Sequence, residues 1–288
     1  MQEGRPSKTA FGVARRRAAH QILDEPPLVL DDPIALRILG PQVAGSIAAE
    51  PEKHDNQAAR AMRAFMVARS RRAEDHLRDA VSEGVKQYVV LGAGLDTFAY
   101  RNPYEQLEVF EVDHPATQQW KRHLLAEAAI DVPPTLTFVP VDFEKQTPEK
   151  QILTDALAQT SFDFDKPAFF SWLGVTPYLT LEAFRATIRV IAAMPEKSGV
   201  TFEYALSRSL LSFREKVALD LLAERVALAG EPFQLFFSPE EMQKELRDAG
   251  FHRTEELTSS DINARYFKKR RDGLQLQGGV ARLITAWV

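Results

Sequence analysis

A run of apolar residues leads straight into two glycines over residues 89–94, Val-Val-Leu-Gly-Ala-Gly. Glycine has no Cβ atom, so the backbone at Gly92 and Gly94, with Ala93 between them, can turn tightly and approach a bound nucleoside. In the fingerprint of dinucleotide-binding proteins, a third glycine lets the next helix pack under the pyrophosphate, and here that position is Thr97. The segment therefore favours a nucleoside ligand without a pyrophosphate.

Acidic residues follow the next two strand-like segments. Glu111 and Asp113 stand at the end of the first, where one carboxylate can accept hydrogen bonds from both ribose hydroxyls, and the sequence does not decide which is used. Asp142 closes the second, where it could hold the exocyclic amine of adenine while Phe143 covers the ring. An acid after a strand is also a common helix N-cap, and Asp113 could be only that. In an open sheet these positions meet at one edge, which predicts an adenosine site there.

Alternating strands and helices must position these residues. Buried strands are expected over residues 87–91, 107–112, 135–139, 168–172 and 199–204. Helices are expected over residues 9–23, 56–83, 115–129, 147–158 and 181–193, with a short helix that begins at Pro33. Because strands and helices alternate in this way, the expected fold class is α/β, with a doubly wound, mainly parallel sheet and right-handed crossovers.

The alternation stops after Tyr204. A long amphipathic helix over residues 207–229 and a second one from Ser238 to Gly250 predict a helical cap at about 205–250. Two more strands are expected over residues 253–257 and 280–286. One domain is expected for the whole chain, residues 1–288, with N-terminal helices within residues 1–55.

The predicted cap is rich in large apolar side chains. Most of them are expected to be core residues, and the remainder, with the N-terminal helix, to roof an apolar acceptor cavity. They are Leu210, Leu211, Phe213, Leu221, Leu222, Phe233, Leu235, Phe236 and Phe237.

Composition argues against several classes of function. The chain has 288 residues and a formal net charge of -4, so it has no global field that would attract nucleic acid or an anionic membrane. It has no cysteine, which excludes disulfides, thiolate zinc sites and a cysteine nucleophile. The six histidines show no metal-ligand spacing, so no metal is expected.

The N-terminal segment has no apolar stretch of the length of a signal peptide core or a membrane span, so a cytoplasmic protein is expected. Two short basic runs, over residues 15–17 and 268–271, are expected to face solvent rather than to bind an anion.

Taken in order, these motifs are similar to those of a known family. Leu-Gly-Ala-Gly-Leu-Asp-Thr over residues 91–97 is followed by Glu-Val-Asp-His-Pro over 111–115. Ala-Arg-Ser over residues 68–70, Val-Asp-Phe over 141–143 and the segment 172–179 complete the pattern. The chain resembles the leucine carboxyl methyltransferase family, and within it the bacterial polyketide-type O-methyltransferases. The resemblance implies a Rossmann-like class I methyltransferase fold and the cofactor S-adenosyl-L-methionine.

The resemblance also implies roles for individual residues. Arg69 would pair with the methionine carboxylate of the cofactor, which suits a guanidinium because it can form two parallel hydrogen bonds. The glycine turn would border the methionine part. Asp113 would hold the ribose, and Asp142 with Phe143 would hold adenine.

One departure from the family pattern concerns the acceptor. Many members carry a glutamate before the glycine of the segment 172–179, and in members that methylate a carboxyl group this glutamate contacts the cofactor. This chain has Leu173 at that position. The departure argues against methylation of a protein C-terminus, so a small, partly apolar acceptor with a hydroxyl or carboxyl group is expected.

Methyl transfer from a sulfonium chiefly requires alignment of the acceptor oxygen with the methyl group. Tyr178 and Tyr204 are the candidate catalytic residues, since both would line the acceptor pocket, although each could equally be a core tyrosine. Two other interpretations stay open. Leu173 allows an S-adenosylmethionine-binding protein without catalytic activity, and the same fold allows an NAD-dependent oxidoreductase, against which Thr97 and Arg69 argue. The sequence names neither the acceptor nor the oligomeric state.

Overall fold

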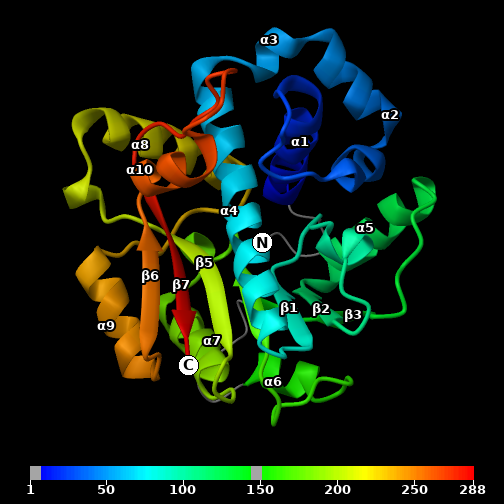
Figure 1. Ribbon diagram of the computed structural model, residues 1–288. Helices are drawn as coiled ribbons and strands as arrows, with labels where there is room; N and C mark the ends of the chain where they lie inside the picture. Colours follow the sequence, from blue (N-terminus) through cyan, green and yellow to red (C-terminus); the bar gives the residue numbers. More distant parts are fainter. Residues whose placement is uncertain (1–7, 144–150) are drawn as a thin grey trace.

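Seven strands form one open sheet, drawn at the centre of Figure 1. The computed structural model describes residues 8–143 and 151–288. The strand order is β3-β2-β1-β4-β5-β7-β6; the first five are parallel, and β7 is antiparallel to both of its neighbours. The strands are β1 (Gln87–Leu91), β2 (Glu108–Asp113), β3 (Leu136–Pro140), β4 (Phe169–Trp172), β5 (Gly199–Ala205), β6 (Arg253–Leu257) and β7 (Ala281–Trp287). The order reverses between β1 and β4, and ligands bind at this kind of position in open α/β sheets.

Helices cover both faces of the sheet, as the continuous apolar strands predict. Successive side chains of a strand point to opposite faces, and in β1 Tyr88 and Val90 pack towards α4 (Gln57–Ser82). Val89 and Leu91 point into the main core, which α6 (Ile152–Leu157), α7 (Leu181–Ala192) and α9 (Pro239–Ala249) cover. The predicted α/β fold with a mainly parallel sheet is confirmed.

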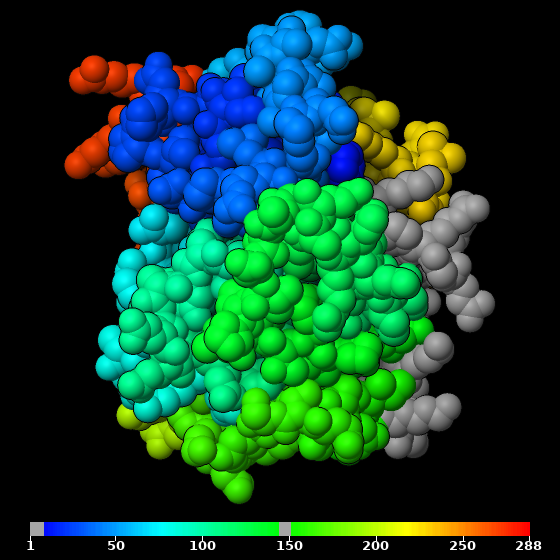
Figure 2. Space-filling model, turned by 90° about the vertical axis from the view of Figure 1, so that its right-hand side faces the viewer, coloured from blue at the N-terminus to red at the C-terminus, as the bar shows by residue number. Residues whose placement is uncertain are grey.

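The N-terminal helices lie across the carboxyl ends of the parallel strands (Figure 1), and Figure 2 shows them as a blue layer above the green half of the molecule. They are α1 (Lys8–Leu23), α2 (Pro33–Ala49) and α3 (Pro51–His54). Arg17 of α1 is buried, donates to the carbonyl of Leu95 and to Asp96 at 3.2 Å, and pairs with Asp32 at 3.4 Å. Asp32 in turn accepts the hydroxyl of Thr97 at 2.7 Å. These contacts fix the loop after β1, and the prediction that residues 15–17 face solvent is wrong for Arg17.

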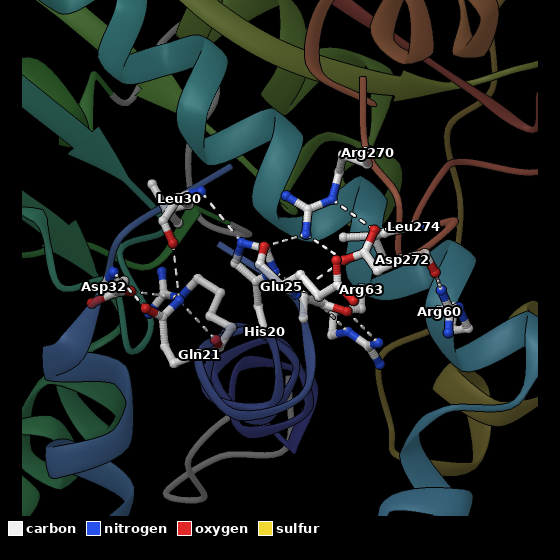
Figure 3. A network of polar contacts seen from close by, with 12 residues as sticks. His20, Gln21, Glu25, Leu30, Asp32, Arg60, Arg63, Arg270, Asp272 and Leu274 are labelled. Carbon is white, nitrogen blue, oxygen red and sulfur yellow. Dashed lines mark hydrogen bonds and ion pairs between the residues drawn. The ribbon is translucent and has the colours of Figure 1, made fainter. Parts of the chain in front are cut away.

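A buried polar network joins α1 to α4 (Figure 3). Arg63 of α4 donates to both carboxylate oxygens of Asp24 at 2.7 Å and to Asp55 at 2.9 Å. His20 of α1 contacts the same Asp24 carboxylate at 2.7 Å. The side chains of Arg63 and Asp24 are each 1% exposed, so neither charge can be solvated by water if the other is removed.

A second part of the network holds the loop after α1 against the C-terminal loop (Figure 3). Arg270 donates to the carbonyls of Glu25 at 2.6 Å and Pro27 at 2.8 Å. Asp272 pairs with Arg270 and accepts the N–H groups of Glu25 and Leu274. The prediction that residues 268–271 form a solvated turn is therefore wrong for Arg270, whose side chain is 8% exposed.

The network makes part of the stability sensitive to acid. Burial opposes ionisation of Asp272, but hydrogen bonds from Arg270, Leu274 and Glu25 outweigh it and lower its pKa to about 2. A carboxyl group with a lowered pKa stabilises the fold fully above the ordinary aspartate pKa, and this contribution is lost as the pH falls towards the lowered value. Asp272→Asn is therefore expected to reduce the free energy of unfolding by about 1 kcal/mol at neutral pH and by less near about pH 2.5.

Urea denaturation of the wild type and the variant at both pH values measures this difference. Asp131 is exposed and serves as a matched control, because Asp131→Asn should leave the free energy of unfolding nearly unchanged at either pH. A loss for Asp272→Asn that is the same at both pH values would contradict the account.

Three segments differ from the expectations drawn from the sequence, and a fourth is described only in part. The helix that begins at Pro33 is not short: α2 continues to Ala49 and bends at Gly40, just before Pro41. The helix expected from residue 207 is α8 (Phe213–Leu228), and it begins later because Ser212 forms a capping box with Glu215. The segment between β6 and β7 contains α10 (Ser259–Ile262) and a π-helical turn (Asn263–Phe267), which were not expected. The helix expected over 147–158 is described only from residue 151 on, as α6; residues 147–150 lie outside the described residues.

The two helices of the predicted cap have different surroundings. α9 packs against α7 and contributes Met242 and Leu246 to the main core. α8 instead lies above the carboxyl ends of the strands, at the upper left of Figure 1. Leu211, Leu235 and Phe237 are buried as expected. Three other apolar side chains of the predicted cap are more than half exposed, so the prediction is wrong for them. These are Leu210, Phe213 and Leu221.

Across residues 8–143 and 151–288, no helix combines the length and the apolar character that a membrane span needs.

Candidate cofactor and acceptor site

A cavity of about 560 Å³ lies at the carboxyl ends of the parallel strands. The loops after these strands form its floor, and α1, α4 and α8 contribute to its walls. Cavities of roughly 300–1,000 Å³ commonly hold small-molecule ligands. Nine of the ten predicted site residues line this cavity: Arg69, Gly92, Ala93, Gly94, Asp113, Asp142, Phe143, Tyr178 and Tyr204.

The glycine turn after β1 has the backbone conformation that the sequence predicts. Gly92 and Gly94 have φ angles of +67° and +50°, which residues other than glycine rarely adopt. A Cβ atom on Gly92 would lie 2.2 Å from Cγ2 of Val175, so the turn also approaches the loop after β4 closely. The N–H groups of Gly92 and Ala93 donate to the carbonyl of Val112 at 2.8 and 3.1 Å, which fixes the turn against β2.

Asp113 ends β2 and faces the cavity. Its carboxylate accepts the N–H groups of Gly94 and of His114, the latter at 2.6 Å. The N-cap of α5 (Pro115–Glu127) is His114, so Asp113 is not the cap of this helix. Burial raises the pKa of Asp113, while the hydrogen bonds from Gly94 and His114 act in the opposite direction. The carboxylate is therefore held at the glycine turn with capacity to accept further hydrogen bonds.

Glu111, the other acidic candidate on β2, does not line the cavity. Its side chain is 1% exposed and forms an ion pair with Lys121 of α5 at 2.6 Å. Burial raises the pKa of Glu111 to about 7, against the effect of Lys121. Glu111 lies two residues before Asp113 and therefore on the same face of β2, but its carboxylate is held by Lys121 under α5, whereas that of Asp113 is held at the glycine turn beside the cavity.

Arg69 of α4 forms a buried ion pair with Glu203, near the end of β5. The same oxygen of Glu203 accepts the N–H of Gly174 at 2.7 Å, which joins the loop after β4 to the pair. Nε of Arg69 and Oε2 of Glu203 are buried and have no hydrogen-bond partner among the described residues.

These two atoms provide a test of whether the cofactor of the resembling family fits. One is a cationic donor and the other an anionic acceptor, and both belong to residues that line the cavity. The methionine part of S-adenosylmethionine carries a carboxylate and an ammonium group, which need a donor and an acceptor respectively. The residues present therefore fit the cofactor, with the carboxylate of Asp113 lining the same cavity at the end of β2.

Asp142 and Phe143 follow β3, and both line the cavity. Phe143 also packs partly against the main core. Leu173, at the position where family members carry glutamate, is another lining residue. The loops after β1, β2, β3 and β4 thus meet at this one cavity.

The two candidate catalytic tyrosines differ in the partners of their hydroxyl groups. Tyr204 is buried and donates to Glu256 of β6, and burial together with this carboxylate raises its pKa well above the usual range. The Tyr178 hydroxyl is hydrogen-bonded to the hydroxyl of Thr9, which itself donates a hydrogen bond to the carboxylate of Glu231. Burial and the negative charge of Glu231 raise the pKa of Tyr178 to about 12, so its hydroxyl keeps its proton at neutral pH.

Sequence analysis did not find Glu203, Thr9 or Glu231. All three line the cavity, but they come from β5, α1 and the segment after α8, far apart in the sequence. Glu203 stands in a predicted strand of apolar residues, Gly-Val-Thr-Phe-Glu-Tyr, where a buried acid was a usable signal. Thr9 and Glu231 carry no such signal. Among the residues that the structure describes, no group of three His, Asp or Glu side chains could hold a metal ion.

Comparisons with known proteins agree with this geometry. The model of the leucine carboxyl methyltransferase family matches residues 10–192. YktD of Bacillus subtilis (strain 168), named as a candidate S-adenosyl-L-methionine-dependent methyltransferase, is 32% identical over 297 residues, which cover 95% of each chain. A protein of Mycobacteroides abscessus with the same description is 34% identical over 176 residues, 59% of this chain and 55% of its own.

Two crystal structures share the fold. One, of a candidate methyltransferase from Thermobifida fusca YX, has a TM-score of 0.59 and 17% identity and covers 99% of this chain and 96% of its own. The other, of a protein from Streptomyces avermitilis, has a TM-score of 0.57 and 16% identity and covers 94% of this chain and 96% of its own. With the family match over residues 10–192 and the relative that spans nearly the whole chain, this protein belongs to the leucine carboxyl methyltransferase family of S-adenosyl-L-methionine-dependent methyltransferases.

Proposed function

We propose that the protein is a single-domain O-methyltransferase that uses S-adenosylmethionine to methylate a hydroxyl or carboxyl oxygen of a small, partly apolar molecule. The observation that carries the proposal is the cavity itself, where Asp113, the glycine turn and the Arg69–Glu203 pair meet an apolar compartment. Thr97 argues against a dinucleotide, because it stands where the dinucleotide fingerprint has its third glycine, and its hydroxyl is buried and donates a hydrogen bond to Asp32.

In this proposal each part of the cofactor has its own residues. Asp113 accepts the ribose hydroxyls, and Asp142 with Phe143 holds adenine. Nε of Arg69 binds the methionine carboxylate, and Oε2 of Glu203 accepts the ammonium group. Glu203 thus provides from β5 the carboxylate that Leu173 does not provide from the loop after β4, so the departure at residue 173 does not remove cofactor binding.

The bound cofactor supplies an electrophilic methyl group whose bond to sulfur breaks as the acceptor oxygen attacks. A carboxylate acceptor needs no base, whereas a hydroxyl acceptor must release a proton. Tyr178 keeps its proton at neutral pH and donates it to Thr9, because the Thr9 hydroxyl already donates to Glu231, so the Tyr178 oxygen is free to accept a hydrogen bond from an acceptor hydroxyl. Thr9 connects it to the carboxylate of Glu231, the group of this cluster that can take a proton. Tyr204 has no direct part, because its hydroxyl is bonded to Glu256.

Incubation with S-adenosylmethionine that carries a radiolabelled methyl group tests the type of transfer. Pools of small apolar acids, phenols and amines serve as acceptors, and the products are treated with alkali. A methyl ester releases labelled methanol under these conditions, a methyl ether keeps the label in the organic product, and either result supports O-methyl transfer. Label found only on amines, or no transfer to any pool despite cofactor binding, would contradict the proposal.

Glu203→Gln tests the assignment of the ammonium group. The variant keeps the shape of the side chain but loses its charge, and a hydrogen bond to a charged group contributes about 1.5–3 kcal/mol. Binding of S-adenosylhomocysteine is therefore expected to weaken at least about 10-fold in calorimetric titration. Binding of 5′-methylthioadenosine, which has no amino acid part, is expected to stay the same and shows that the site is folded.

A second variant provides a rescue. Leu173→Glu in the Glu203→Gln background returns a carboxylate to the family position and is expected to recover part of the affinity for S-adenosylhomocysteine. The assignment of Glu203 fails if its variant binds both ligands as the wild type does, or if it loses both to the same extent.

A further inference from the structure

We infer that the acceptor is an amphipathic anion, with an apolar body in the compartment under α8 and an anionic group held between Arg16 and Arg225. The inference deepens the proposed function, on which it rests, and concerns the binding of the acceptor in the same cavity. The two arginines come from different helices, α1 and α8, and both line the cavity.

The arginines of this region fall into two groups. Arg17 is paired with Asp32 and Asp96, and Arg69 is paired with Glu203, so their charges are balanced within the protein. Arg16 and Arg225 have no carboxylate within the 4.0 Å of a salt bridge among the described residues. Among the described residues, the Arg16 side chain donates a hydrogen bond to the backbone carbonyl of Gly12 at 2.8 Å.

Two unbalanced guanidinium groups in one cavity repel one another. Burial and the charges of Arg225, Arg69 and Arg15 lower the pKa of Arg16, which is the expected effect of neighbouring cations. An anionic ligand group would reverse this repulsion, and guanidinium groups bind carboxylates through pairs of parallel, charge-assisted hydrogen bonds. The carboxylate of Glu231 lines the same cavity, but it accepts the hydroxyl of Thr9 and pairs with neither arginine.

The surroundings of the two arginines are apolar. α8 directs Leu219, Leu222 and Val226 towards the cavity, so Arg225 stands beside the apolar face of its own helix. Phe65 of α4 and Phe233, after α8, add aromatic surface to the same cavity. A ligand that buries an apolar body here and places its charge at the arginines uses both features, whereas a neutral molecule leaves the cations without a partner.

A pair of fluorescent probes tests this inference, with S-adenosylhomocysteine present at saturation. 8-Anilinonaphthalene-1-sulfonate and N-phenyl-1-naphthylamine share their apolar rings, but only the first carries an anionic group. The sulfonate is expected to bind the wild type about 10-fold more tightly than the neutral probe. In Arg16→Gln/Arg225→Gln, the two affinities are expected to agree within about threefold.

Arg214→Gln is the matched control, because Arg214 is an exposed arginine on α8 that does not line the cavity, and it should keep the full preference. Circular dichroism melting shows whether each variant is folded. Equal affinity of the wild type for both probes, no saturable binding of the sulfonate, or an undiminished preference in the double variant would overturn the inference. Calorimetry with S-adenosylhomocysteine distinguishes failure of the inference from failure of the proposed function. Normal binding of S-adenosylhomocysteine without a preference for the sulfonate probe defeats the inference alone. Absence of S-adenosylhomocysteine binding defeats the proposed function.

Discussion

Replacement of Asp113 by alanine is expected to weaken the binding of S-adenosylmethionine at least about tenfold. The N–H groups of Gly94 and His114 hold the carboxylate at the cavity, so both ribose hydroxyls can donate to it without rearrangement. Burial raises the pKa of this group, and two more donors would favour its charged form. Each such hydrogen bond to a charged group contributes about 1.5–3 kcal/mol.

Calorimetric titration with S-adenosylhomocysteine and 5′-methylthioadenosine measures the effect. Both ligands contain the ribose, so both should lose affinity, in contrast to the selective loss expected for Glu203→Gln. The fold should be retained, because His114 and not Asp113 caps α5. Asp131→Ala removes an exposed aspartate and serves as the control. Unchanged affinity of Asp113→Ala for either ligand would refute the assignment of the ribose site.

Replacement of Arg63 by methionine is expected to lower the free energy of unfolding by about 3–5 kcal/mol. Arg63 is the centre of the buried network in Figure 3, with Asp24 at 2.7 Å and Asp55 at 2.9 Å. Methionine fills a similar volume but leaves the Asp24 carboxylate buried without its cation, and this uncompensated charge causes most of the loss. His20 stays in contact with Asp24 and limits the loss.

Urea denaturation measures this loss, and the chain offers two controls. Arg78 lies on the same helix, but its side chain is 56% exposed, so Arg78→Met should change the free energy of unfolding by about 1 kcal/mol or less. Addition of Asp24→Leu to Arg63→Met removes the orphaned charge and should recover part of the stability. Equal losses for Arg63→Met and Arg78→Met would show that the network does not stabilise the N-terminal helices.

The sheet could be predicted closely because its signals are local. The apolar run over residues 87–91 is covered by helices on both faces, and its length and bounds follow directly from the sequence. The capping signals of α9 were equally informative, because Ser238 caps its start and Gly250, in a left-handed conformation, ends it. The bend of α2 at Gly40 was missed because the residues after Pro41 were not read as a continuation of the same helix.

Contacts between distant segments could not be predicted. The sequence left Glu111 and Asp113 as alternatives, and only their partners in the fold, Lys121 for Glu111 and the N–H of Gly94 for Asp113, distinguish them. Arg17 was expected to face solvent because a basic run usually does, but its partners Asp32 and Asp96 belong to other segments. Phe213 was expected to be buried and is 82% exposed, since the apolar pattern of α8 does not show which of its faces meets the cavity.

The most direct test of the account is a calorimetric titration of the purified protein with S-adenosylmethionine, S-adenosylhomocysteine and NAD in parallel. The account predicts saturable binding of the first two at one site per chain and no binding of NAD. Binding of NAD alone, or of none of the three, would contradict the assignment of this cavity as the cofactor site.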